Sequence, residues 1–137
     1  MANVIPKQEK LLITDGWAGQ TLKACLLSST FTYNHATHYT YTAVSGSEIS
    51  GTGYMAGGEL LTSLDSDYVD TSTVYFDAAD VQWGPGATFS NARYLCIYDT
   101  VANRVRQILD FDSAQSCTNS TFTVQFHANG IVRISST

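Results

Sequence analysis

The strongest constraint on the fold is a series of short segments in which apolar and polar residues alternate. This period places successive side chains on opposite faces of a β-strand. Turn-forming residues, mainly Gly, Asn and Asp, separate the segments. The alternation predicts about eight short strands, at residues 21–29, 60–64, 74–76, 81–83, 93–99, 105–111, 121–126 and 131–135. The rhythm indicates an all-β fold, either an antiparallel β-sandwich or a jelly-roll-like barrel.

Several local signals predict where these strands end. Gly84-Pro85-Gly86 is the strongest break in the chain, because Gly permits positive φ angles and Pro lacks a backbone donor. Residues 65–67 and 77–80 read as turns, and residues 112–120 as a loop. Asn129-Gly130 is a hairpin signal. Residues 93–99 are apolar on both faces, which predicts a central strand.

Helical structure is limited to one or two short helices at most. One is expected at residues 8–13, around a single apolar cluster. Residues 31–44 leave two alternatives open: their Tyr, Phe and Thr content favours a strand, whereas Asn34 could cap a helical turn over residues 36–41.

The 137 residues contain no internal repeat and no low-complexity linker, so we expect a single β domain at residues 8–137. Residues 1–7 read as an N-terminal arm, with Pro6 restricting Ile5 to extended conformations. The N-terminus has no apolar core of signal-peptide length, and no apolar run approaches the roughly 18 residues of a membrane span. We therefore expect a protein that folds in a cytoplasm, without a membrane partner.

The surface is expected to carry few charges. Charged residues make up 14% of the chain, against roughly 25% in typical soluble domains, and Ser and Thr number 31. Such a surface is suited to being covered by neighbours, which favours an oligomer or an assembly component. The net charge is −5 and the seven basic residues are scattered, which disfavours nucleic-acid binding.

The three cysteines, Cys25, Cys96 and Cys117, have neither metal-site nor redox-motif spacing. Cys25 and Cys96 lie in apolar runs, where a free thiol behaves as a small buried hydrophobe. Cys117 lies in a polar segment that reads as a turn, with no expected role. An odd number of cysteines argues against a secreted disulfide scaffold.

Candidate metal ligands are sparse. His35 and His38 would share a face of a helix, but no carboxylate or third His lies near them in sequence. Asp65, Asp67 and Asp70 have the spacing that opens a calcium loop, without its central Gly or its closing Glu. We interpret both groups as polar surface and predict no metal or cofactor site.

Candidate catalytic residues are equally weak. Asp77 and Asp80 lie near Trp83 in sequence, as in some glycosidase clefts, and Asp110 and Asp112 would share one side of a strand end. Aspartates in such positions are more often turn residues whose side chains bond nearby backbone N–H groups. Nucleophile-elbow and phosphate-loop patterns are absent. We therefore predict no catalytic residue and no enzymatic activity.

Aromatic residues form the remaining candidate surface. If exposed, some of them could stack against a sugar or contact another protein, and residue type does not distinguish the two. The candidates are Tyr33, Tyr39, Tyr41, Tyr68 and Trp83.

Four motifs, in order, resemble a family of small structural proteins of tailed bacteriophages. The first is EKLLITDGWAGQTLKACLLSSTFTY, and the second is the glycine-marked SGTGYMAGGELL. The third is VYFDAADVQW followed by ARYLCIYD, and the last is ILDFDSAQSCTNSTFTVQFHANGIVRIS. The resemblance covers roughly residues 8–135. The three cysteines and the aromatic-rich segment 31–41 depart from the family pattern.

The resemblance implies a virion structural protein and supplies no catalytic residues. With the acidic, weakly charged composition, it leads us to expect a capsid decoration (cement) protein that bridges major capsid proteins on the head exterior, commonly as a homotrimer or another symmetric oligomer. The alternatives are a tail, head–tail junction or tail-fibre component, or a carbohydrate-binding module displayed on the virion.

Overall fold

The computed structural model describes residues 13, 16–69, 73–127 and 130–135. The predicted arm at residues 1–7 and nearly all of the helix predicted at 8–13 lie outside these ranges. The chain divides into two compact units. We call residues 21–60 and 81–124 the hairpin unit, and residues 1–20, 61–80 and 125–137 the terminal unit. A single domain over residues 8–137 stays a prediction.

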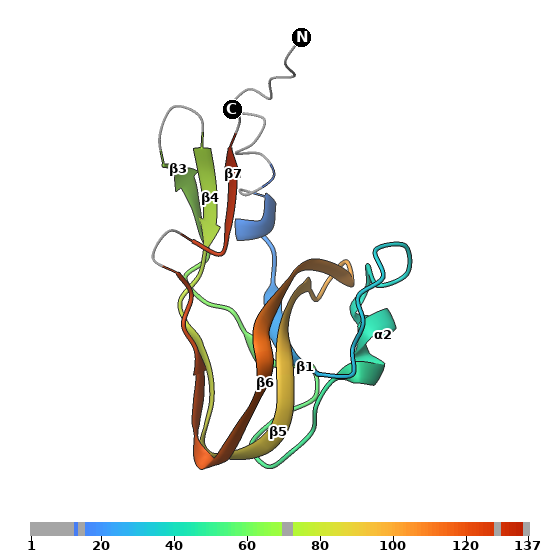
Figure 1. Ribbon diagram of the computed structural model, residues 1–137. Helices are drawn as coiled ribbons and strands as arrows, with labels where there is room; N and C mark the ends of the chain where they lie inside the picture. Colours follow the sequence, from blue (N-terminus) through green and yellow to red (C-terminus); the bar gives the residue numbers. More distant parts are fainter. Residues whose placement is uncertain (1–12, 14–15, 70–72, 128–129, 136–137) are drawn as a thin grey trace. The chain divides into compact units, whose positions relative to one another are not determined.

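The hairpin unit contains a four-stranded antiparallel sheet in the order β2-β1-β5-β6. Its members are β1 (Leu22–Ser28), β2 (Glu59–Leu60), β5 (Val81–Asp99) and β6 (Arg104–Val124). Strands β5 and β6 form one long twisted hairpin (Figure 1). Strand β5 is central and β6 lies at the sheet edge, so β6 has one strand neighbour among the described residues.

The core of the hairpin unit lies where β1 pairs with β5. Cys25 is directly opposite Cys96, and both are fully buried with free thiols, as predicted. Their face packs with Leu27, Phe31, Val44 and Tyr98. The hydrogen bond with Cys96 and, to a smaller extent, burial raise the pKa of the Cys25 thiol. These thiols therefore serve as small core side chains.

Two predicted breaks lie inside the long hairpin instead of ending it. Gly84-Pro85-Gly86 falls within β5, where the register with β6 shifts between Trp83 and Ala87. Residues 112–120, predicted as a loop, belong to β6. Asp112 and Asn119 have φ angles of 68° and 45°, and β-bulges absorb such residues without ending a strand. The prediction of uniformly short strands was wrong for this reason.

The position of Cys117 is corrected by the same finding. It lies in β6 with a side chain only 8% exposed, and its thiol donates a hydrogen bond to the Ala87 carbonyl at 3.3 Å. Because β6 continues through residues 112–120, Cys117 is a buried residue of the sheet and does not lie in a turn.

The terminal unit contains a three-stranded antiparallel sheet in the order β3-β4-β7. The strands are β3 (Asp65–Tyr68), β4 (Thr73–Asp77) and β7 (Val132–Ser135). The prediction of a turn at residues 65–67 was wrong, because these residues pair with β4. Trp17 packs edge-on against the buried Phe76 at 5.7 Å between ring centroids.

Helices are short, as predicted: α2 (Tyr41–Val44), the 3-10 helix η1 (Ser45–Ser47) and the helical residues 16–18. Two antiparallel sheets and few short helices confirm the all-β, sandwich-like class. Neither sheet closes into a barrel among the described residues. These residues contain seven strands, against about eight expected: β5 and β6 each absorb two predicted segments, and β3 forms where a turn was predicted.

Candidate functional site

The segment at residues 31–40 connects β1 to α2, and local hydrogen bonds fix its shape. The Asn34 side chain accepts a hydrogen bond from the Ala36 amide at 2.9 Å, which makes an Asx turn. The Asn34 amide donates to His38 Nδ1 at 3.0 Å, and the His38 amide donates to the Asn34 carbonyl at 2.8 Å. The result is neither of the predicted alternatives: Asn34 organises a turn, and the helix begins later, at Tyr41, capped by Thr40.

This segment is attached to the edge of β6. The Val105 amide donates to the Tyr39 carbonyl at 3.0 Å. The guanidinium of Arg104 lies over the Tyr39 ring, 5.3 Å from its centroid, at cation–π distance. Asn103 Nδ2 donates to Thr42 Oγ1 at 2.9 Å. The first part of β6 is therefore covered by a loop.

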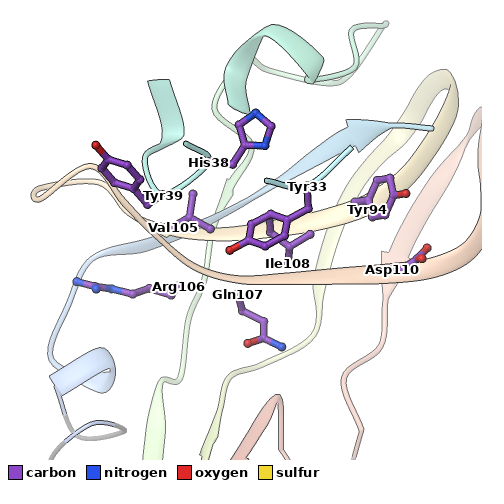
Figure 2. Close-up of a pocket in the computed structure, with 9 residues that line it drawn as sticks. All are labelled: Tyr33, His38, Tyr39, Tyr94, Val105, Arg106, Gln107, Ile108 and Asp110. Atoms are coloured by element: carbon purple, nitrogen blue, oxygen red, sulfur yellow. The ribbon is translucent and has the colours of Figure 1, made fainter. Parts of the chain in front are cut away.

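A pocket of about 450 Å³ opens between this loop and the sheet (Figure 2). We call it the loop pocket. Its volume lies within the range of small-molecule sites. The side chains that line it are Tyr33, His38, Tyr39, Tyr94, Val105, Arg106, Gln107, Ile108 and Asp110.

Aromatic and apolar side chains form most of the loop pocket. Tyr33 and Tyr39 are 56% and 53% exposed, so their rings remain available for contact. Val105 and Ile108 extend from β6 toward the two tyrosines, whereas Gln107 and Arg106 extend from the other side of the strand (Figure 2).

The floor of the loop pocket is braced from behind. Tyr94, Val105 and Ile108 pack against the core cluster around Cys25 and Cys96. Buried Phe31 lies edge-on to Tyr94 at 5.5 Å and near His38 at 5.1 Å between centroids. The pocket is thus built on packed side chains of the sheet rather than on the loop alone.

One residue that lines the loop pocket, Asp110, belongs to a charge pair. Arg93 donates to both carboxylate oxygens of Asp110, at 3.0 Å from Nε and 3.3 Å from Nη2. The Asp112 amide adds a third hydrogen bond, at 2.8 Å, to Asp110 Oδ1. The Arg93 hydrogen bonds hold the pKa of Asp110 below its usual range, and the same pair raises the pKa of Arg93. The pair carries no net charge.

A second polar cluster is centred on Glu48, the residue that directly follows η1. Its carboxylate accepts hydrogen bonds from Tyr41 Oη at 2.7 Å, Tyr54 Oη at 2.6 Å and the Gly57 amide at 2.9 Å. Tyr54 Oη also accepts from the Leu26 amide at 2.9 Å. Burial, followed by the bond to Glu48, raises the pKa of both tyrosines. With every partner supplied by the chain, this cluster serves to fix residues 51–58 against the sheet.

Close backbone contact reinforces that attachment. Gly58 has a φ angle of 81°, and a Cβ at this position would collide with the Ala24 carbonyl oxygen. The Tyr98 hydroxyl donates to the Gly57 carbonyl at 2.6 Å. No spacing pattern in the sequence signals the Glu48 cluster, because its partners come from separate loops and strands.

The aspartates considered from the sequence have separate structural positions. Asp65 lies opposite Asp77 in the β3–β4 ladder, and Tyr75 Oη donates to Asp65 at 2.8 Å. Asp80 accepts from the Phe126 amide at 2.9 Å, in the role of a loop residue. Asp110 belongs to the loop pocket, and Asp112 occupies a positive-φ position beside it. Asp70 lies outside the described residues.

The aromatic candidates divide between exposed and buried. Tyr33, Tyr39 and Tyr68 are exposed, Tyr41 is half-buried and bonded to Glu48, and Trp83 is fully buried. Trp83 stacks on Tyr54 at 6.0 Å between centroids, and its burial removes it from the candidate surface aromatics.

Neither a metal site nor a membrane-spanning helix is found in the described part of the chain. Residues 13, 16–69, 73–127 and 130–135 contain no group of three His, Cys, Asp or Glu side chains placed to hold a metal ion. His38 contributes Nδ1 to a local hydrogen bond instead. Across the same ranges, every helix is too short or too polar to cross a bilayer.

Comparisons with protein-family models, with curated proteins and with solved structures find no match to this chain. The class of the fold therefore rests on the geometry of the two sheets alone.

Proposed function

We propose that this chain is a structural protein of a tailed-bacteriophage virion, and that it acts as a capsid decoration (cement) protein on the head exterior. The ordered motifs that resemble the phage family support the proposal from the sequence. The observation that carries it structurally is the second half of β6, which is an uncharged strand edge.

The β6 edge contains no charged residue from Ser113 to Thr123. Soluble proteins usually protect such edges with charges, Pro or bulges, because free N–H and C=O groups recruit other strands. Here the register with β5 shifts at several points and Asn119 has a positive φ, so bulges interrupt this edge, but neither a charge nor a Pro protects it. Most of its side chains are exposed Ser, Thr and Asn. This edge is suited to accept a strand or an arm from a neighbouring subunit.

Such contacts give a cement protein its mechanism. Each edge contact contributes backbone hydrogen bonds and modest area, and several equivalent contacts act together in a symmetric oligomer, for which a homotrimer is our expectation. The acidic net charge of −5 disfavours contact with packaged nucleic acid and suits a position outside the shell. The role requires no catalytic residue or cofactor, and its partner would be the major capsid protein.

Copy number tests the location. Quantitative mass spectrometry of purified phage particles should find the chain in hundreds of copies, and particles lacking it should lose resistance to heat and osmotic shock. A few copies per particle would instead assign it to the tail, the head–tail junction or a tail fibre. Absence from purified particles would overturn the virion proposal altogether.

A further inference from the structure

We infer that the loop pocket binds a neutral saccharide, with Tyr33 and Tyr39 as stacking surfaces and Asp110 as a hydroxyl-recognition group. Nothing in the proposed cement role requires this pocket. A sugar ring presents C–H groups on its faces and hydroxyl groups around its rim. A suitable site therefore needs exposed aromatic faces next to paired donors and acceptors.

The aromatic component is present and pre-positioned. Tyr33 and Tyr39 are each more than half exposed, yet their segment is held by the Asn34 turn and by the Val105 amide. Arg104 lies over one face of the Tyr39 ring. Rings held in place lose little side-chain freedom when a ligand binds, which favours affinity. Amphipathic phenol groups suit a ligand that is apolar on one side and hydrated on the other.

The polar component has hydrogen-bonding capacity to spare. Arg93, which is not among the lining residues, donates two N–H groups to Asp110 and so fixes the carboxylate. Asp110 Oδ2 accepts one hydrogen bond, and a carboxylate oxygen can accept two. Asp110 can therefore accept a hydrogen bond from a sugar hydroxyl while Arg93 holds its carboxylate in place.

Two ion pairs near the pocket favour a neutral ligand, although Arg104 adds a positive charge beside the Tyr39 ring. Asp110 is matched by Arg93, and Arg106, on the other side of β6, is paired with Asp99 at 3.4 Å. The whole chain is acidic, which disfavours phosphorylated or sialylated glycans. With a volume of about 450 Å³, the loop pocket is of a size for a small saccharide rather than a folded partner.

Titration of the ¹⁵N-labelled full chain with sugars tests the inference. The probes are glucose, galactose, mannose, N-acetylglucosamine, maltotriose and chitotriose. At least one should give saturable shifts confined to the amides of residues 33–39, 93–94 and 104–112, with a Kd on the order of millimolar. A decaproline peptide is titrated in parallel, because extended Pro-rich segments also dock on aromatic grooves.

Variants separate stacking from a merely structural effect. Tyr33→Ala and Tyr39→Ala should each weaken binding about tenfold, while Tyr33→Phe should keep most of it because the ring remains. Asp110→Asn should also weaken binding, since it removes an acceptor and the ion pair. The matched control is Tyr68→Ala, which removes an exposed tyrosine of β3 in the terminal unit. The folded state of each variant is checked from its own amide spectrum.

Two results would overturn the inference. One is that none of the six sugars produces saturable shifts, whether or not decaproline binds. The other is that a sugar binds equally well to the wild type and to folded Tyr33→Ala and Tyr39→Ala variants. Copy number in virions is measured independently, so failure here would leave the cement proposal standing.

Discussion

The two halves of β6 are one strand with opposite surroundings. From Arg104 to Asp110, the edge is bonded to a loop at Val105, and the half contains both arginines of the strand and takes part in two ion pairs. From Ser113 to Thr123 the strand has no charge, and no strand covers its outer edge among the described residues. Both halves pair with β5 through the same backbone ladder. Side chains, rather than the backbone, therefore distinguish a half that forms a pocket from a half that offers an edge.

The loop over the covered half is connected to a network of hydrogen-bonded side chains, and among the described residues the open half has no such network. The loop over it continues into α2, whose Tyr41 is bonded to Glu48 and stacked on Tyr98 at 4.4 Å between centroids. The open half is fixed to β5 by the ladder, by Phe122 packing against Trp83 and Phe89, and by hydrogen bonds of Cys117 and Thr88. Changes to the Glu48 cluster should therefore destabilise the protein far more than changes along the open edge.

Glu48→Ala is expected to have the largest effect. It leaves the hydroxyls of Tyr41 and Tyr54 and the Gly57 amide without their acceptor. Hydrogen bonds to a charged group contribute more than neutral ones, and buried donors without partners are costly, so the free energy of unfolding should fall by about 3 kcal/mol. Chemical denaturation measures the change.

The matched control is Glu59→Ala, which removes the half-buried carboxylate of β2. It should change the free energy of unfolding by less than about 0.5 kcal/mol. Equal losses for the two variants would contradict the central role given to Glu48.

Alkaline pH should produce the next largest effect, through Tyr54. Its pKa in the folded protein is raised, so the folded state retains a proton that the unfolded chain releases above about pH 10. The stabilisation is thus fully present below pH 10 and is lost as pH rises beyond it. Each such group contributes at most about 1.4 kcal/mol per pH unit. The raised pKa of the Cys25 thiol adds a loss that begins near about pH 8.5, so denaturation between pH 8 and pH 11.5 should show a decline that steepens above pH 10.

Tyr54→Phe identifies the group responsible. This variant should be less stable than the wild type at pH 8, because the hydrogen bonds to Glu48 and the Leu26 amide are lost, but should show a shallower decline above pH 10. Tyr33→Phe, which removes an exposed hydroxyl, is the control and should keep the wild-type profile. An unchanged slope in Tyr54→Phe would contradict the assignment.

The sequence predicted the backbone better than it predicted the site. Alternation located the segments that became β1, β4 and β7, and the apolar run at residues 93–99 correctly predicted a central strand. The breaks predicted at Gly84-Pro85-Gly86 and at residues 112–120 were wrong, because a β-bulge accepts the same residues as a turn. A local pattern cannot distinguish the two, since the partner strand decides whether the chain continues or reverses.

Only some residues of the candidate site could be predicted from the sequence, for a related reason. Tyr33 and Tyr39 were recognisable as aromatic residues in a polar segment, but their pocket also requires Ile108 and Asp110 from β6. The placement of these residues depends on the register of β6 with β5 and on the bulges within it. The alternation of a single strand does not encode that register, so Asp110 was taken for a strand terminus.

The smallest effect on stability, and the sharpest test of the open half, is expected from Ser116→Lys. Ser116 is exposed in the uncharged part of β6, so the added charge should change the free energy of unfolding by less than about 0.5 kcal/mol. Placed on the edge, however, it should repel a strand that adds there, as edge lysines do in natural sheets.

Sedimentation should show that the wild-type protein is an oligomer and that Ser116→Lys dissociates it. Gln82→Lys places the same charge at an exposed position of the central strand β5 and should preserve the oligomer. If the wild type is a monomer, or if both variants dissociate equally, the uncharged edge of β6 is not an assembly surface. If Ser116→Lys loses assembly but keeps sugar binding, the two halves of β6 work separately.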